Sequence, residues 1–508
     1  MKVSDLFRFK DEKIKVLHLT MIAFFITFVT WFNMAPLATT MIEETGWLTA
    51  KHIGVLGIMN VALTIPARII IGSLLDKYGP RVVFSLLLIV MSIPTFVFAF
   101  GDTWAQIAIS RLLMSCIGAG FVIGIRMVSE WFPPKSVGFA EGFYAGWGNF
   151  GSAFAAMTLP WIAFNLFGGD NGWRYAVAAT GAICLIYGFI YYALVKNTPE
   201  NKAYFKPKSA HALEVSSWKD LIQLICWTLP LVGALALLTW RLGNTDFISN
   251  TAANIIYVVL GIVFVYQVFR ILQVNLPILR KGVPDDDKYK FKNVAALNTT
   301  YFANFGAELA VVSMLPMFFQ NTFSLTPTAA GLIASTFAFV NLFARPLGGI
   351  LSDRLKNRKM VMLVYMAGIT LGFFSMGLMT EGWPIIMAVA ITILTSMFVQ
   401  GAEGSTFAII PMIKKRLTGQ IAGMAGAYGN VGAVTYLTIL TLVSTQQFFF
   451  ILAGGALISF LTCWALLEEP KGSFADDYVT SSVDKELAGL KMGSKPVGVL
   501  TADAAATK

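Results

Sequence analysis

Two stretches of the sequence, RIIIGSLLDKYGPR at residues 68–81 and RPLGGILSDRLKNR at residues 345–358, align without a gap at an offset of 277. A second pair of stretches, GWGNFG at residues 146–151 and AYGNVG at residues 427–432, aligns at an offset of 281. Two motifs that recur at nearly one offset indicate two homologous halves. The sequence therefore predicts that one structural unit is built twice along the chain.

The repeat also divides the rest of the chain into segments. The predicted boundaries are 1–196 for the first six-helix half, 197–292 for a linker with an extra transmembrane hairpin at about 221–274, 293–470 for the second six-helix half, and 471–508 for a cytoplasmic tail. The tail is rich in Ser, Gly, Ala, Lys and Asp, and it holds too few large apolar residues to fold alone. We therefore expect the tail to be disordered.

The composition indicates that these halves lie in a lipid bilayer. Apolar residues make up 56% of the 508 residues and charged residues only 13%, which excludes a soluble globular protein and a disordered one. The net charge of +10 does not indicate nucleic-acid binding, because the basic residues lie in short clusters between apolar runs. The four cysteines lie in separate apolar runs without metal or redox spacing, so no disulfide, metal site or cofactor is expected.

Runs of about 20 apolar residues cross a bilayer as helices, so counting the runs counts the helices. We count fourteen: 17–40, 52–75, 81–101, 104–130, 137–165, 173–196, 221–242, 253–274, 293–320, 327–352, 358–380, 383–411, 419–444 and 447–468. The sequence thus predicts an all-α polytopic membrane protein with both termini on one side.

The distribution of basic residues predicts which side that is. With the amino terminus inside, only Lys51, Arg174 and Arg241 of the 38 Lys and Arg residues fall outside. Arg68, Arg111, Arg126 and Arg345 lie within helices, and all the others fall in inner loops or tails. The positive-inside rule then predicts cytoplasmic termini and a multi-pass protein of the cell (inner) membrane.

Arg68 and Arg345 are the residues that point most directly to a substrate. Arg68 lies eight residues before Asp76 at the predicted inner surface, so a rise of ~1.5 Å per residue puts it about 12 Å into a core ~30 Å thick. Arg345 has the same spacing to Asp353. A cation at that depth costs at least ~2.5 kcal/mol and normally marks a substrate pathway. The pair predicts a site with a net charge of +2 and an anionic substrate.

The alternative is that each arginine pairs with a membrane-embedded carboxylate, for which Glu308 and Glu403 are the clear candidates. Direct binding is favoured because the arginine fork donates two parallel hydrogen bonds to a planar oxyanion. Small planar oxyanions fit this chemistry.

The motifs also resemble a known group. The repeated loop motif, together with ISRLLMSCIGAG at 109–120, resembles the major facilitator superfamily over nearly the whole chain outside the linker. The paired glycine-asparagine motifs and paired arginines, with FGAEL at 305–309 and GSTFAIIP at 404–411, are similar to the nitrate/nitrite porter family. The usual member of the superfamily has twelve helices, so the hairpin is a departure from the pattern.

This resemblance implies roles for further residues. Asn149 and Asn430 are expected to contact nitrate, while the alternative for these glycine-flanked residues, and for Gly148 and Gly429, is helix packing. The resemblance also implies a tyrosine and two rings that sandwich the flat anion. The matching residues are Tyr301, Phe121 and Phe407.

The resemblance further implies that the inner loops latch the transporter between its conformations. Asp76, Arg81, Asp353 and Arg358 are the expected latch residues. Simple anchoring by positive charge is compatible with the same positions.

Taken with the residues, the resemblance implies a secondary transporter that imports nitrate, and nitrite as an additional substrate, by alternating access. Proton symport is the first hypothesis, with Glu308 as the proton acceptor and Glu403 as the second choice. Nitrate/nitrite antiport and, less favoured, a membrane nitrate sensor are the alternatives. The sequence gives no sign of an enzyme, and the expected partners are the anion, protons and the lipid bilayer, with a monomer as the working oligomeric state.

Overall fold

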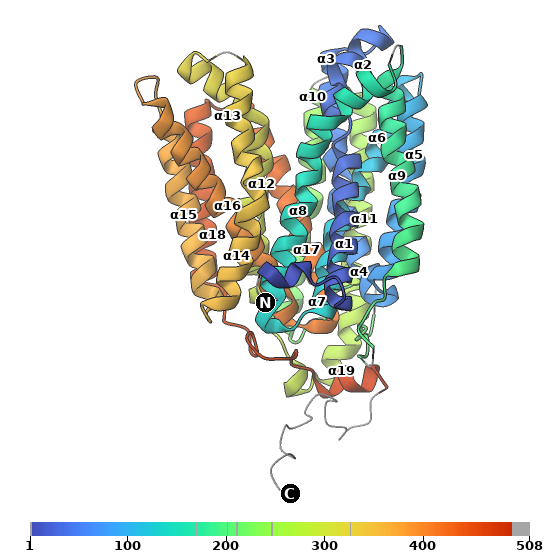
Figure 1. The fold of residues 1–508 in the computed structure, drawn as a ribbon. Coiled ribbons are helices and arrows are strands. Elements are labelled where there is room, and N and C mark those ends of the chain that lie inside the picture. The colour runs from blue at the N-terminus through green and yellow to red at the C-terminus, as the bar shows by residue number, and fades with distance from the viewer. Residues whose placement is uncertain are drawn as a thin grey trace, which may run out of the picture.

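The computed structural model describes residues 3–489, apart from residues 169, 201, 210–211, 245–246 and 326. Within these residues the chain is helical and contains no strand. The helices run roughly parallel in two groups, which lie apart at the upper end of Figure 1 and meet at the lower end. We call the lower end, at which α4 and α14 finish, the loop face.

The first half begins and ends at the loop face. Its helices are η1 (Val3–Phe7), α1 (Glu12–Trp31), η2 (Ala35–Leu37), α2 (Ala38–Thr45), α3 (Ala50–Ala62), α4 (Thr64–Tyr78), α5 (Pro80–Phe100), α6 (Trp104–Met114), η3 (Ser115–Ala119), α7 (Gly120–Trp131), α8 (Pro134–Trp161), η4 (Ile162–Leu166) and α9 (Gly172–Leu194). Pairs such as α3 and α4 are one membrane span interrupted in the middle.

The second half repeats this order. Its helices are η5 (Asp285–Asp287), α12 (Phe291–Phe323), α13 (Pro327–Phe339), α14 (Asn341–Arg354), α15 (Arg358–Gly377), α16 (Ile385–Ile413), η6 (Lys415–Leu417), α17 (Thr418–Leu440), α18 (Thr445–Leu466) and, after it, α19 (Ser482–Leu487). The interrupted span is repeated as α13 and α14.

The two interruptions fall at matching positions. α3 gives way to α4 at Leu63, and α13 gives way to α14 at Val340, so the breaks have the same offset of 277 as the loop motifs. In the first half Pro66 lacks the N–H that would bond the carbonyl of Ala62, which weakens the helix there. Phe343 stands at the matching position of the second half, so the repeated break does not depend on proline.

Every predicted apolar run is a helix in the structure. Twelve of these segments, among the described residues, are long and apolar enough to cross a membrane. The other two predicted runs correspond to α8 and α17, which are 28 and 23 residues long and carry the glycine-asparagine motifs. Both are largely buried against other helices, so they face protein rather than lipid and need not be as apolar.

Near the loop face, helices of the two halves pack against each other at glycine residues. α4 packs on α17 and α14 packs on α8. A Cβ atom on Gly72 would overlap the backbone of Gly419, and one on Gly349 would overlap the backbone of Gly138. Small residues at a crossing let two backbones approach closely, which is how membrane helices pack without a hydrophobic driving force.

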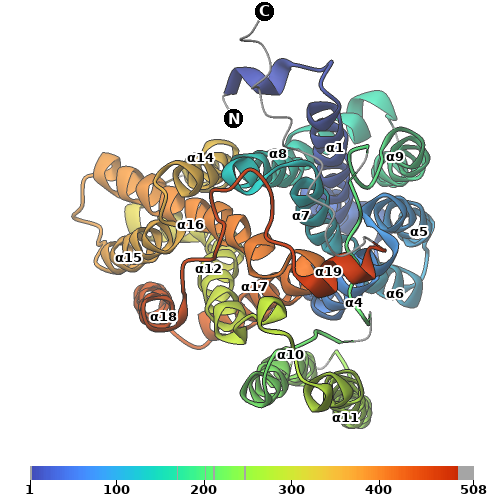
Figure 2. The same ribbon diagram turned by 90° about the horizontal axis from the view of Figure 1, so that it is seen from below.

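The extra hairpin consists of α10 (Trp218–Asn244) and α11 (Asn250–Lys281), and it lies at the edge of the bundle (Figure 2). α10 packs on α17, where the hydroxyl of Tyr428 donates to the carbonyl of Trp227 at 2.5 Å. α11 touches chiefly α10 and leaves most of its apolar surface exposed. The hairpin is therefore attached to the bundle through one of its two helices.

The prediction that the tail is disordered is wrong for residues 471–489. This segment crosses the loop face and ends in α19, and Ser473, Ser481 and Asp484 are buried there. Its polar side chains find partners on the charged loops, a contact that its composition alone does not reveal. Residues 490–508 lie outside the described part of the chain.

Candidate functional site

Arg68 lies on α4 with its side chain fully inside the bundle. Its Nε donates to the carbonyl of Gly118 at 3.2 Å, and its Nη1 donates to the carbonyl of Gly426 at 2.5 Å. No carboxylate among the described residues pairs with it, although only 1% of its surface is exposed. Two carbonyl dipoles do not neutralise a guanidinium, so Arg68 keeps an uncompensated positive charge.

Arg345, the equivalent residue on α14, has a different environment. Its Nη2 is in direct contact with the carboxylate of Glu403 on α16 and lies 3.8 Å from that of Glu308 on α12. Glu308 also accepts a hydrogen bond from the amide of Asn341 at 2.8 Å. The predicted net charge of +2 is therefore wrong when both acids are ionised, because the two carboxylates beside Arg345 bring the summed charge of the four groups to zero, although neither carboxylate pairs with Arg68.

Asn149 on α8 faces the guanidinium of Arg345. With its amide oxygen turned toward the arginine, Asn149 accepts from Nη2 at 3.2 Å and also from Nη1, which satisfies both groups. Asn430 on α17 is completely buried, and neither atom of its amide has a partner in the described structure. A buried amide without partners is unfavourable, so Asn430 is the more available of the two for a ligand.

Aromatic rings gather between the two arginines. The rings of Phe121 on α7 and Tyr301 on α12 are parallel within 2° at a centroid distance of 6.0 Å. Phe407 on α16 presents itself nearly perpendicular to both, at 4.5 Å from Phe121 and 4.8 Å from Tyr301. The predicted rings therefore lie together, but Phe407 closes the cluster from the side and is no parallel partner of Phe121.

Sequence reasoning missed Phe305 as a site residue. Its ring is parallel to that of Tyr301 within 3° at 5.0 Å, and the guanidinium carbon of Arg68 lies 5.2 Å from its centroid. The same carbon lies 5.7 Å from the centroid of Phe121, so Arg68 contacts both rings. Phe305 follows Tyr301 by four residues, which puts both on one face of a helix, and that spacing was the available signal.

Gly148 and Gly429 leave room for aromatic rings to pack against their helices. A Cβ on Gly148 would overlap the ring of Phe24 on α1, and a Cβ on Gly429 would overlap Tyr301 and Phe305. Phe24 and Tyr301 are themselves related by the offset of 277. The glycines of the asparagine motifs thus admit one aromatic wall in each half.

The aspartates of the repeated loop motif bind across the halves. Asp76 accepts from the backbone N–H groups of Gly419 and Gln420, at 2.9 and 2.8 Å, in the first turn of α17. Asp353 accepts from Gly138 and Phe139, at 3.1 and 2.8 Å, in the second turn of α8. For Asp76 this position is favourable, because a carboxylate at the amino terminus of α17 satisfies free N–H groups and meets the positive end of the helix dipole.

The arginines of the loop motif do not share one role. Arg358 donates to Asp353 at 2.9 Å and, across the halves, to the carbonyl of Pro134 at 2.7 Å. Arg81 instead donates to the carbonyl of Tyr192 within its own half. The expected contribution of Arg81 to a latch between the halves is thus absent from this conformation.

In the second half Asp353 pairs with the motif residue Arg358, but in the first half Asp76 pairs with Arg126 and not with the motif residue Arg81. The Nε of Arg126 lies 3.5 Å from Asp76 and its Nη2 lies 3.0 Å from Glu130, and it also donates to the carbonyl of Lys415 in the other half. Lys415 donates in return to the carbonyl of Ser129. These reciprocal bonds join the end of α7 to η6, and tertiary contacts of this kind have no signal in local sequence.

Comparisons with known proteins give the following similarities. The model of the Major Facilitator Superfamily matches residues 20–283 and 297–491. The chain is 46% identical to "Nitrate/nitrite transporter NrtP" of Picosynechococcus sp., over 92% of this chain and 95% of that protein, and 46% identical to the protein of the same name of Nostoc punctiforme, over 94% and 96%. It is 22% identical to "Probable nitrate/nitrite antiporter NarK1" of Thermus thermophilus, over 92% and 96%.

Solved structures resemble the fold. The proton:xylose symporter XylE aligns with a TM-score of 0.61 at 14% identity, covering 92% of this chain and 97% of its own. The Escherichia coli fucose:proton symporter FucP aligns with a TM-score of 0.59 at 11% identity, covering 90% and 100%.

Proposed function

The chain belongs to the nitrate/nitrite porter family of the major facilitator superfamily, and we propose that it imports nitrate, with nitrite as a second substrate, by proton symport. It is a multi-pass membrane transporter and not an enzyme. The printed names of its relatives support nitrate and nitrite as substrates of this chain. The loop face is the cytoplasmic side of the cell membrane in this proposal, because the basic loops and tail gather there.

The observation that carries the substrate proposal is the environment of Arg68. A buried guanidinium without a carboxylate, flanked by the rings of Phe121 and Phe305, offers a flat anion both charge and two faces to stack on. Asn430 supplies a buried amide that has no partner among the described residues. Nitrate is planar and singly charged, so it matches the positive charge of Arg68 and the flat faces of these rings.

The surroundings of Arg345 explain how a proton could be coupled to anion binding. The carboxylate of Glu403 contacts the guanidinium of Arg345, to which an anion would also have to bind. The carboxylate of Glu308 lies 3.8 Å from the same guanidinium. Protonating a carboxyl would release Arg345 and raise the net charge of the site by one, so that anion and proton bind more favourably together than apart. This thermodynamic coupling is what a symporter requires.

Symport also meets the electrical requirement of import. Each nitrate that enters a cell with a negative interior costs ~2.3 kcal/mol per 100 mV. One proton cancels this charge, and two protons let the membrane potential drive entry.

Antiport is the second candidate, and the printed name of the Thermus relative supports it. An exchanger carries nitrite out for each nitrate that it carries in, so it needs no group that binds and releases a proton. The presence of Glu308 and Glu403 beside Arg345 is the feature that favours symport over this alternative.

Uptake of labelled nitrate into proteoliposomes tests both modes. We expect accumulation with an inward proton gradient and no internal nitrite, and its loss when the gradient is collapsed. Accumulation that requires internal nitrite and ignores the gradient would replace symport with antiport. Absence of uptake in every condition, from folded protein, would overturn nitrate as the substrate.

A further inference from the structure

We propose that residues 473–484, which we call the strap, hold the loop face closed and must release one half before that face can open. The strap follows α18, crosses beneath both halves and ends in α19. The inference rests on the alternating access of the proposed function, and it is independent of which anion is carried.

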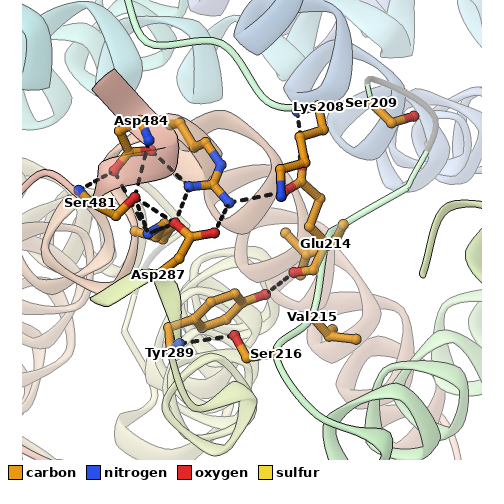
Figure 3. Close-up of polar contacts among 12 residues, drawn as sticks. Lys208, Ser209, Glu214, Val215, Ser216, Asp287, Tyr289, Ser481 and Asp484 are labelled. Carbon is orange, nitrogen blue, oxygen red and sulfur yellow. Dashed lines mark hydrogen bonds and ion pairs between the residues drawn. The ribbon is translucent and has the colours of Figure 1, made fainter. Parts of the chain in front are cut away.

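The far end of the strap is anchored in a buried ionic cluster (Figure 3). Asp484 lies 2.7 Å from Nη1 of Arg416, which in turn lies 2.6 Å from Asp287. The hydroxyl of Ser481 donates to Asp287 at 2.5 Å, and the ammonium of Lys414 lies 3.3 Å from that hydroxyl. Because Arg416 and Lys414 precede α17 and Asp287 precedes α12, this end of the strap belongs to the second half.

The near end of the strap is held by Arg358. The carbonyl of Ser473 accepts from Nη2 of Arg358 at 3.1 Å, and the guanidinium carbon lies 5.2 Å from the ring of Phe474. Arg358 begins α15, so the strap is bound to the second half at both ends. Between these ends it has to pass the first half.

Tyr478 makes the contact that closes the face. Its hydroxyl donates to the carbonyl of Phe132 in the first half at 3.1 Å, while its ring lies 4.1 Å from the ammonium of Lys415 in the second half. Lys415 itself contacts Ser129. Tyr478 therefore covers the junction between the α7–α8 connection and η6, and it cannot keep both contacts once these loops separate.

The strap is bound unequally to the two halves. Its contacts with the second half include buried ion pairs, and breaking one partner out of such a pair is strongly unfavourable. Its remaining contacts outside that half are exposed pairs, such as Asp477 with Lys202 of the linker at 3.5 Å, and exposed pairs contribute little. When the face opens, the strap should stay on the second half and release the bond from Tyr478 to Phe132.

The test measures opening directly in the full chain. Spin labels at Lys77 and Leu355, which are exposed on the loop face in different halves, report the closed and open populations by their distance distribution. Tyr478→Phe keeps the ring on Lys415 but removes the hydroxyl, and we expect a rise of about threefold or more in the ratio of open to closed protein. A chain that ends at Lys471 should show a larger rise, and Asp477→Asn, the matched control at an exposed pair, should show none.

The possible outcomes distinguish a failure of the strap proposal from a failure of alternating access. An unchanged distribution in Tyr478→Phe and in the shortened chain, with wild-type protein that still opens when nitrate or acid is added, would overturn the strap alone. A single closed population in all variants and conditions would overturn alternating access and the strap with it. Because Tyr478→Phe removes one atom, the test stands even where the shortened chain does not fold.

Discussion

Arg68 and Arg345 occupy equivalent positions of the repeat but differ in what neutralises them. Arg68 has only carbonyl partners, whereas Arg345 has two carboxylates. The uncompensated residue should contribute more to the binding of an anion in the conformation described here. The compensated residue is better suited to respond to protons.

Arg68→Lys should weaken nitrate binding by about tenfold or more, although the charge is retained. A lysine loses the planar fork, and one charge-assisted hydrogen bond of ~1.5–3 kcal/mol corresponds to at least tenfold in affinity. Nitrate titration of the purified protein measures this directly. Arg81→Lys, which changes a partly exposed arginine at the start of the next span, α5, serves as the control and should bind nitrate as the wild type does.

Glu403→Gln should abolish proton-driven accumulation while nitrate exchange persists. The amide cannot take up a proton, and Arg345 loses the carboxylate that competes with the anion, so nitrate affinity should rise as well. Glu308→Gln should have the smaller effect, because Glu308 lies further from the guanidinium and shares its charge with Asn341. Uptake and exchange measured on both variants would contradict the proposal if Glu403→Gln still followed the proton gradient.

The motifs marked single positions of the candidate site, but not the contacts that those residues make. Arg68, Arg345, Asn149 and Tyr301 could be found because repetition, membrane depth and resemblance mark single positions. The pairing of Arg345 with Glu403 rather than with Glu308 depends on how α14 packs on α16, and one sequence does not contain that contact. The same reason hid the bond from Arg126 to η6.

At the scale of helices, the glycine crossings between the halves set how closely α14 can approach α8. Gly349→Ala would put a methyl group into the backbone of Gly138, and overpacking of this kind costs about 1–3 kcal/mol. We expect a lower unfolding temperature in detergent. Gly331→Ala, where α13 leaves open space, should be neutral or slightly stabilising.

The hairpin gives a test of topology. Its turn, before the residue Ser249 that caps α11, lies at the end of the bundle opposite the loop face, so a cysteine at Ser249 should react with a reagent added outside intact cells. A cysteine at Leu355 should react only after the membrane is permeabilised. The reverse pattern would invert the proposed orientation.

Helices were predictable where their surface meets lipid, because an apolar run of sufficient length has few other structures available. The repeated breaks at Leu63 and Val340 were not, because Pro66 follows only the first break and Phe343 stands at the matching position of the second. Nor was α19, a six-residue helix in a polar tail that depends on the partners of Asp484. Features that rest on distant contacts are those that composition and periodicity miss.

For the whole molecule, Lys415 makes the closure of the loop face sensitive to pH. Burial lowers the pKa of its ammonium to about 8, against the attraction of Glu130 and with the help of Arg126. In a conformation open at this face the ammonium is hydrated, and its pKa returns toward ~10.4. The open state then binds more protons between these values, so the closed state gains as the pH rises through 8.

The spin-label pair at Lys77 and Leu355 should record this dependence. Between pH 7 and about 9 the ratio of open to closed protein should fall, by at most about tenfold per pH unit for one group. Lys415→Arg, which stays charged, should flatten the curve. A slope that survives this substitution would assign the pH dependence to another residue.

The matching offsets of the loop motifs, the helix breaks and the aromatic walls are the trace of a duplicated gene whose ancestor encoded six helices. Copies with an even number of helices insert in the same direction, so two such chains could once have paired as separate subunits. The connection between them still allows that arrangement, because residues 195–217 contain no helix where the structure describes them and α10 packs on α17 of the second half. Two polypeptides divided within this connection and produced in one cell should reassemble into a working carrier, with the hairpin borne by the second.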